Sequence, residues 1–180
     1  MAGIPFAYDM SWVREISTNR GHTLGALSDS RKVMLVFLRH FGCTFCREAM
    51  ADLHRVRMQI ASQNTELILV HQMSETYAQQ IMEIYGLEDT HRISDPNLEL
   101  YKAFNLKRGG LRQMFSLRVW LHGFRAGILK GHFVGRERGD GWQMPGVFIY
   151  HKGRILDAFV HEYASDRPDY VKLAACEAPH

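Results

Sequence analysis

The sequence predicts a single α/β domain with a mixed central sheet, because two buried-type strands flank a helical pattern and a hairpin follows near the C-terminus. Residues 33–38 (VMLVFL) are an unbroken apolar run, too short for a free helix and typical of a strand covered on both faces. Residues 67–70 (LILV) are a second such run. Residues 147–150 and 155–160, joined by the turn HKGR, have the pattern of a β-hairpin.

A long helix is predicted between the first two strands, over about residues 43–64. Its apolar positions recur at steps of three or four, which places them on one helix face: Phe45, Ala49, Leu53, Val56 and Ile60.

Three further helices are predicted from their ends or their apolar spacing. Ser74 is the expected N-cap of one helix, which Gly86 ends. Asp95 and Pro96 are expected to supply the N-cap and the first helical position of a short helix that runs through Phe104. Residues 170–175 form a tail helix, and residues 1–19 are an amphipathic lead-in.

The composition is that of an ordinary globular protein and excludes several other classes. The 180 residues are 46% hydrophobic with a net charge of only +3, which rules out general disorder and gives no indication of nucleic acid binding. No apolar run approaches a membrane span, so we expect no membrane contact. The first thirty residues lack the pattern of a secretory signal, and the expected compartment is therefore cytoplasmic.

Two of the three cysteines, Cys43 and Cys46, form a Cys-Thr-Phe-Cys motif where a predicted strand ends and a predicted helix begins. The amide groups and partial positive charge of a helix N-terminus favour the thiolate, which is the reactive form of cysteine. Arg39 and Arg47 flank the motif, and their charges are expected to lower the thiol pKa further. The spacing allows a disulfide within the motif, with Cys43 the more exposed residue and Cys46 partly covered.

Two other interpretations of the cysteine pair remain open at this stage. A structural zinc site would need further ligands, which Cys176 and the scattered histidines could supply, in a non-catalytic binding or adaptor module. The two cysteines could also be small buried residues without chemistry. The position of the pair between a strand and a helix favours redox chemistry. Such chemistry needs no metal or organic cofactor, and Cys176 is then expected to be an inert thiol.

Three segments resemble the peroxiredoxin-like 2 family, which consists of thioredoxin-fold proteins of the wider AhpC/TSA group. FLRHFGCTFCRE (residues 37–48) is similar to the active-site turn of this family, and SDPNLELYKAF (residues 94–104) is similar to a segment common in peroxiredoxins. MPGVFI (residues 144–149) resembles the segment in which thioredoxin folds place a cis-proline beside the redox cysteines. The resemblance implies a thioredoxin-like fold, with Pro145 in the cis form after Met144.

The resemblance implies catalytic roles for Cys43 and Cys46 but leaves their order open. In the peroxiredoxin register Thr-x-x-Cys, Cys46 attacks the peroxide and Cys43 replaces the threonine. In the thioredoxin register, Cys43 attacks and Cys46 resolves. Thr44, Arg39, Arg47, Met144 and Pro145 are the expected supporting residues.

Residues 107–141 form a basic, aromatic insertion before the predicted proline loop. They hold eight lysines and arginines against two acidic residues, and the resemblance extends to this insertion. It could cover an anionic, apolar substrate or a membrane surface, or its aromatic residues could simply be buried while its arginines stay solvated. Arg136 and Arg138 are the candidates for an arginine that orients the substrate oxygens.

The sequence therefore predicts a thiol-dependent oxidoreductase that reduces hydrogen peroxide or organic peroxides. The alternative within the enzymes is a disulfide reductase of the thioredoxin type. A thioredoxin- or glutathione-type reductant is the expected partner in either case, because the oxidised pair must be reset.

Overall fold

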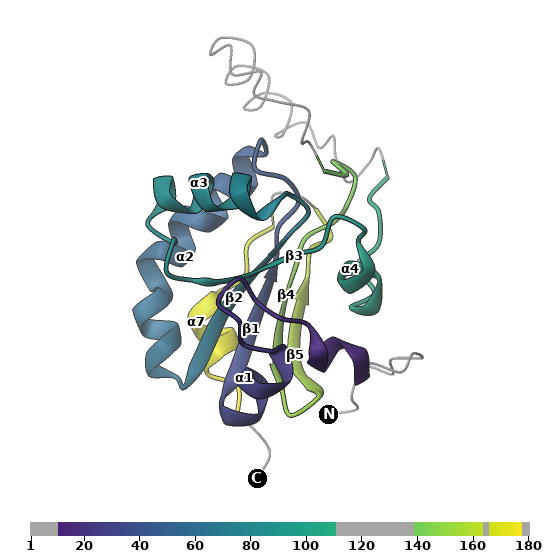
Figure 1. The fold of residues 1–180 in the computed structure, drawn as a ribbon. Helices are drawn as coiled ribbons and strands as arrows, with labels where there is room; N and C mark the ends of the chain where they lie inside the picture. The colour runs from purple at the N-terminus through teal and green to yellow at the C-terminus, as the bar shows by residue number, and fades with distance from the viewer. Residues whose placement is uncertain (1–10, 111–138, 164–165, 178–180) are drawn as a thin grey trace.

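A five-stranded mixed sheet forms the centre of the molecule, with the strand order β3-β2-β1-β4-β5 (Figure 1). The computed structural model describes residues 11–110, 139–163 and 166–177. The strands are β1 (Lys32–Phe37), β2 (Thr65–His71), β3 (His91–Ser94), β4 (Gly146–His151) and β5 (Arg154–Val160). The helices are η1 (Ser11–Glu15), α1 (Leu24–Ser30), α2 (Thr44–Ser62), α3 (Glu75–Tyr85), α4 (Glu99–Ala103) and α7 (Tyr170–Ala174).

The central strand β1 pairs in parallel with β2 on one side and antiparallel with β4 on the other. The parallel pair is joined through α2, as parallel strands require a crossover, and β4 returns directly through the hairpin to β5. The mixed sheet predicted from the sequence is thus confirmed. Because β1 and β2 run in parallel, their carboxyl ends lie at the same edge of the sheet, and residues that follow the two strands become neighbours.

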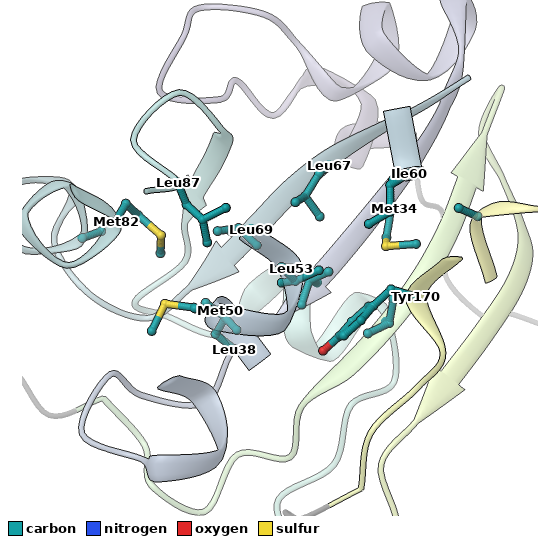
Figure 2. Close-up of a cluster of buried hydrophobic side chains, with 14 of the residues drawn as sticks. Met34, Leu38, Met50, Leu53, Ile60, Leu67, Leu69, Met82, Leu87 and Tyr170 are labelled. Carbon is teal, nitrogen blue, oxygen red and sulfur yellow. The ribbon is translucent and has the colours of Figure 1, made fainter. Parts of the chain in front are cut away.

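The sheet is covered on both faces, which explains the continuous apolar run of β1. Met34 and Val36 face the core beneath α2, α3 and α7, whereas Val33, Leu35 and Phe37 face the core beneath η1, α1 and α4. Figure 2 shows the first of these cores, in which side chains of α2 and Tyr170 of α7 pack on residues of β1 and β2.

The predicted ends of α3 are confirmed. The Ser74 side chain accepts a hydrogen bond from the Tyr77 amide, and Gly86 ends the helix in the left-handed conformation with φ of 64°. Two side chains of α2 contact the Gly86 carbonyl: His54 Nδ1 lies 2.9 Å and Arg57 Nη1 3.1 Å from Gly86 O.

We expect Gly86→Ala to lower the free energy of unfolding by about 1–2 kcal/mol, because the left-handed conformation disfavours a side chain. An added Cβ would also lie 2.7 Å from His54 Cε1. Gly21→Ala is the matched control, since Gly21 has φ of 76° with nothing within 4 Å of the added atom. Urea titration should give a larger loss for Gly86→Ala than for Gly21→Ala. Equal losses of unfolding free energy in the two variants would mean that the close contact with His54 does not add to the destabilisation by Gly86→Ala.

The short helix predicted after Asp95 is present, but its start is wrong by about three residues. Leu98, in the left-handed conformation, is the N-cap of α4, so Pro96 does not occupy the first helical position. Asp95 still holds the helix start, because its carboxylate accepts hydrogen bonds from the amides of Glu99, Leu100 and Tyr101. Because of the turn between them, Leu98 occupies the N-cap position while the side chain of Asp95 supplies the capping hydrogen bonds.

Two short elements were not predicted from the sequence. The strand β3 contains the polar residues His91 and Arg92, which are buried by its pairing with β2 and by the chain near Asn19. The helix α1 begins at a Thr23 cap. The lead-in is a 3-10 helix that buries Val13 completely, and residues 1–10 lie outside the described part of the chain.

Most of the predicted basic insertion, residues 111–138, lies outside the described residues. Its two described ends meet, because the Gly109 amide donates to Trp142 O at 2.7 Å and Arg108 forms an ion pair with Asp140. In the described part of the chain, no helix has the length and apolar character needed to cross a membrane.

Candidate active site

Cys43 and Cys46 lie where β1 gives way to α2, as predicted. The strand ends at Phe37, and the intervening turn is closed by a hydrogen bond of 3.0 Å from the Cys43 amide to His40 O. Cys43 is the N-cap of α2, and its carbonyl accepts a hydrogen bond from the Arg47 amide. The helix begins at Thr44, so Cys46 falls in its first turn, with its side chain directed toward the core.

The two thiols occupy different environments. Cys43 is half-buried, whereas Cys46 is only 4% exposed, and both are free thiols. The hydrogen bond with Cys46 lowers the pKa of Cys43 to about 6, and the charge of Arg39 and the amides at the helix start act in the same direction against the effect of burial. The pKa of Cys46 is raised well above its ordinary value by the same hydrogen bond and by its burial. These surroundings therefore favour the thiolate form at Cys43 rather than at Cys46.

Arg39 is the cation that lies against this thiolate. Its side chain is 5% exposed, with Nη1 3.8 Å from Cys43 Sγ and Nη2 bonded to Gly141 O. Arg47 lies on the same turn, where its exposed side chain donates from Nε to Phe41 O at 3.1 Å and so stabilises the turn. Of the two predicted arginines, only Arg39 makes a hydrogen bond to a cysteine sulfur.

The predicted cis-proline is wrong, because no peptide bond between the described residues is cis. Pro145 follows Met144 in the trans form, which is the favoured isomer of an X–Pro bond. This conformation satisfies the loop's hydrogen bonds, with the Met144 amide donating to Lys107 O and Pro145 O accepting from the His161 amide. Pro145 nevertheless lines a cavity beside Cys46, and Met144, which precedes it, is buried.

A small cavity of about 20 Å³ lies beside the buried cysteine, with room for roughly one water molecule. Cys46, Pro145, His161, Arg167 and Tyr170 are among its lining residues. Burial lowers the pKa of His161 to about 4, so its ring is neutral at pH 7. Sequence reasoning missed His161 and Tyr170, because neither stands in a motif and both reach the cavity only through the packing of β5 and α7.

The remaining candidate residues are placed as follows. Thr44 begins α2, and Arg136 and Arg138 lie outside the described residues. Cys176 lies at the opposite end of β1, because its carbonyl accepts from Lys32 Nζ at 2.8 Å, and burial raises its pKa. Within the described ranges, no three His, Cys, Asp or Glu side chains are grouped so that they could hold a metal ion.

A mixed sheet covered by helices, with a cysteine pair at the start of the first long helix, defines a thioredoxin-like fold. Solved peroxiredoxins share this fold. Peroxidoxin BcpB from Mycobacterium tuberculosis matches with a TM-score of 0.61 and 14% identity, over 89% of this chain and 88% of that one. A PrxQ variant from Xylella fastidiosa matches with a TM-score of 0.63 and 14% identity, over 96% and 91%. The predicted thioredoxin-like fold is thus confirmed.

The chain is similar in sequence to peroxiredoxin-like 2C. The human protein is 36% identical over 87 residues, and the mouse protein is 33% identical over 95 residues. A thioredoxin-like protein of Arabidopsis thaliana, AAED1, is 24% identical over 155 residues, which cover 81% of this chain and 62% of the relative. The predicted resemblance to the peroxiredoxin-like 2 proteins is confirmed.

The sequence similarities cover only part of this chain and of its relatives. The human and mouse matches cover 47% and 52% of this chain, but only 38% and 41% of the relatives, so the chain matches about two fifths of their length. No family model matches the sequence. The comparisons support a redox role for the domain, and the reaction itself has to be argued from the site.

Proposed function

We propose that this protein is a thiol-dependent oxidoreductase that reduces peroxides, with Cys43 as the attacking thiolate and Cys46 as the resolving thiol. The observation that carries the proposal is the position of the half-buried Cys43 at the N-cap of α2, with Arg39 Nη1 3.8 Å from its sulfur. The hydrogen bond with Cys46, together with these surroundings, lowers the pKa of Cys43 to about 6. A thiolate is the nucleophile in peroxide reduction. The similarity to peroxiredoxin-like 2C supports the choice of substrate.

The proposed cycle has two steps before the protein is reset. The Cys43 thiolate attacks one oxygen of the peroxide ROOH, the O–O bond breaks, and the products are Cys43 sulfenic acid and RO⁻, which takes up a proton. The Cys46 thiol then attacks the Cys43 sulfur, so the disulfide forms and one water molecule leaves. A dithiol reductant, or two monothiols, restores both cysteines by exchange and is itself oxidised to a disulfide.

The environments of the two thiols suit these roles. Cys43 is accessible to substrate and carries the charge, whereas Cys46 is protected from the solvent and held within hydrogen-bonding reach of Cys43. Arg39 can stabilise the negative charge on the attacking sulfur. The cycle suits the reducing cytoplasm proposed as its compartment, where thiol reductants of the thioredoxin or glutathione type are available.

A disulfide reductase is the second candidate, and the position of the thiolate favours it. In a peroxiredoxin register the second cysteine of this motif would attack, but here the first cysteine has the lowered pKa. This is the order expected for thiol–disulfide exchange. In that reaction the Cys43 thiolate attacks a substrate disulfide, so that one substrate thiol leaves and a mixed disulfide forms. Cys46 then attacks the Cys43 sulfur, which frees the second substrate thiol and leaves a Cys43–Cys46 disulfide.

The test is the intact mass of the reduced protein, quenched by alkylation at intervals after one equivalent of hydrogen peroxide or of an organic hydroperoxide. A Cys176→Ser background removes the third thiol. We expect rapid loss of about two hydrogens and a mapped Cys43–Cys46 disulfide.

A parallel reaction with a model protein disulfide separates the two candidates. If the disulfide forms rapidly only with the protein substrate, the disulfide reductase replaces the peroxidase. If both thiols stay alkylatable for many minutes with every oxidant, both proposals are wrong.

A further inference from the structure

Gln72 is a buried polar residue that follows the carboxyl end of β2, next to the turn that carries the cysteines. Its side chain is 6% exposed, although it belongs to none of the motifs predicted from the sequence. It reaches the cysteine turn because β1 and β2 run in parallel and end at the same edge of the sheet. A buried amide needs hydrogen-bond partners, and the backbone partners of Gln72 come from two different segments.

The Gln72 side chain joins the cysteine turn to the loop before β4. Its Nε2 donates to Arg39 O at 2.8 Å, and its Oε1 accepts from the Asp140 amide at 2.5 Å. Nε2 also lies 3.5 Å from Asp140 O. The partners determine the orientation of the amide, because a carbonyl can only accept and a backbone N–H can only donate.

The loop of residues 139–143 is pressed closely against Gln72. Gly139 has φ of 42°, and a Cβ there would lie 2.8 Å from Gln72 Oε1 and 2.5 Å from Met73 Cε. The Asp140 carboxylate accepts from the Trp142 amide at 2.9 Å and so closes the loop internally. The next carbonyl along, Gly141 O, is the acceptor for Arg39 Nη2.

Gln72 therefore influences both the backbone and the guanidinium of Arg39. Gln72 bonds the Arg39 backbone directly, and through Asp140 it fixes the loop whose Gly141 carbonyl receives the guanidinium. The other terminal nitrogen of this guanidinium, Nη1, lies 3.8 Å from Cys43 Sγ. A shift of the loop or of the Arg39 backbone would change this distance, and with it the attraction between the guanidinium and the sulfur.

We infer that Gln72 is a positioning residue for the attacking thiolate, which acts by holding Arg39 against Cys43. This inference rests on the proposed function, in which Cys43 is the nucleophile. Gln72 does not bond either cysteine in any described contact, so its effect on Cys43 has to pass through Arg39. A purely structural role, in which the amide only stabilises the loop, is the alternative that the experiment must exclude.

In the described part of the chain, the charged and titratable groups around Cys43 come from the cysteine turn, α2 and the loop before β4. From the turn and α2 come Arg39 and Arg47, of which the second is bonded to Phe41 O. The loop contributes Asp140, whose carboxylate is paired with Arg108. The ring of His40 lies beside Gly42 and Gly141.

The test is the pH dependence of Cys43 alkylation by iodoacetamide in the full-length chain, with the modified cysteine identified by peptide mass. We expect Gln72→Met, which keeps the length of the side chain, to raise the midpoint of this dependence by about 1 pH unit. Arg39→Met should raise it by at least as much. The double variant should match Arg39→Met alone, because Gln72 has no effect once the guanidinium is gone.

Gln143 provides a matched control in the same loop. It is also buried, at 2% exposed, but its Nε2 donates to Leu106 O at 2.9 Å and to Lys107 O at 3.3 Å. Gln143→Met should lower the melting temperature and leave the midpoint unchanged. If Gln72→Met fails to fold, Gln72→Asn retains the amide but is too short to reach both partners, and it should raise the midpoint by a smaller amount.

Each result has a definite meaning. A lower melting temperature with a wild-type midpoint in Gln72→Met would assign Gln72 a structural role only and overturn the inference. Equal midpoint shifts in Gln72→Met and Gln143→Met, or additive shifts in the double variant, would do the same. A wild-type midpoint near the ordinary cysteine value of about 8.5 would instead overturn the proposed function itself.

Discussion

Cys43→Ser is expected to reduce turnover with peroxide by roughly 1000-fold or more, because it removes the nucleophile. Cys46→Ser is expected to stop the cycle one step later, with Cys43 held as a sulfenic acid. The physical reason is the difference between the two sulfurs, since the pKa of Cys43 is lowered to about 6, whereas the hydrogen bond with Cys43 and burial raise the pKa of Cys46. In Cys43→Ser, the remaining thiol stays buried and loses its partner.

Trapping of the sulfenic acid with dimedone, followed by peptide mapping, measures this outcome directly. The adduct should appear on Cys43 in the Cys46→Ser variant and be nearly absent from Cys43→Ser. Cys176→Ser is the control and should turn over like the wild type, since Cys176 lies at the far end of β1. An adduct on Cys46 in Cys43→Ser, formed at the wild-type rate, would instead establish the peroxiredoxin register.

Acidification from pH 6.5 to pH 4 is expected to destabilise the protein through His71, by about 3 kcal/mol when the full effect has developed. His71 is 1% exposed, and burial lowers its pKa to about 4, with the charge of Arg92 acting in the same direction and that of Glu75 against it. Neither ring nitrogen has a hydrogen bond within the described part of the chain, and Nε2 lies 3.6 Å from Glu75 Oε2.

The sign follows from comparing the folded and unfolded states. The unfolded chain takes up a proton on His71 near pH 6.5, whereas the folded protein does so only near pH 4. Between these values the unfolded state binds more protons, so stability is lost as the pH falls. Above pH 6.5 the ring is neutral in both states, and the stabilisation is fully present.

The measurement is the free energy of unfolding in urea at a series of pH values. His71→Phe keeps a ring beside Phe41, whose centroid lies 5.8 Å from that of His71. The variant should lose less stability than the wild type over this range. The pKa of His161 is also lowered to about 4, so His161→Phe should account for a further part of the slope. Identical slopes for wild type and His71→Phe would contradict the prediction.

Local signals in the sequence were sufficient for much of the fold. The apolar run of β1 and the helical spacing of α2 are properties of adjacent residues, and the structure confirms both. Ser74 and Gly86 satisfy the backbone at the ends of α3 through their own side-chain and backbone chemistry. The strand β3 was missed because His91 and Arg92 are polar and become buried only through partners elsewhere in the chain.

The form of Pro145 and the start of α4 show the same limit of local information. A proline permits the cis isomer without requiring it, and the hydrogen bonds of the surrounding loop are made with the trans form. Asp95 is a good capping residue in any context, but the turn at Leu98 decides which amides its carboxylate reaches.

By itself, the sequence determined that two cysteines stand at the start of a helix behind a buried strand, since spacing and periodicity specify both. Only the tertiary structure gave the two sulfurs different environments, which lower the pKa of Cys43 and raise that of Cys46. Those environments depend on burying the Cys46 side chain at the start of α2 and on holding Arg39 between Cys43 and Gly141, a residue about one hundred positions later in the chain. The electrostatic environment of a thiol is set by the charges and the burial around it, and here the parallel ends of β1 and β2 and the loop before β4 bring those groups together.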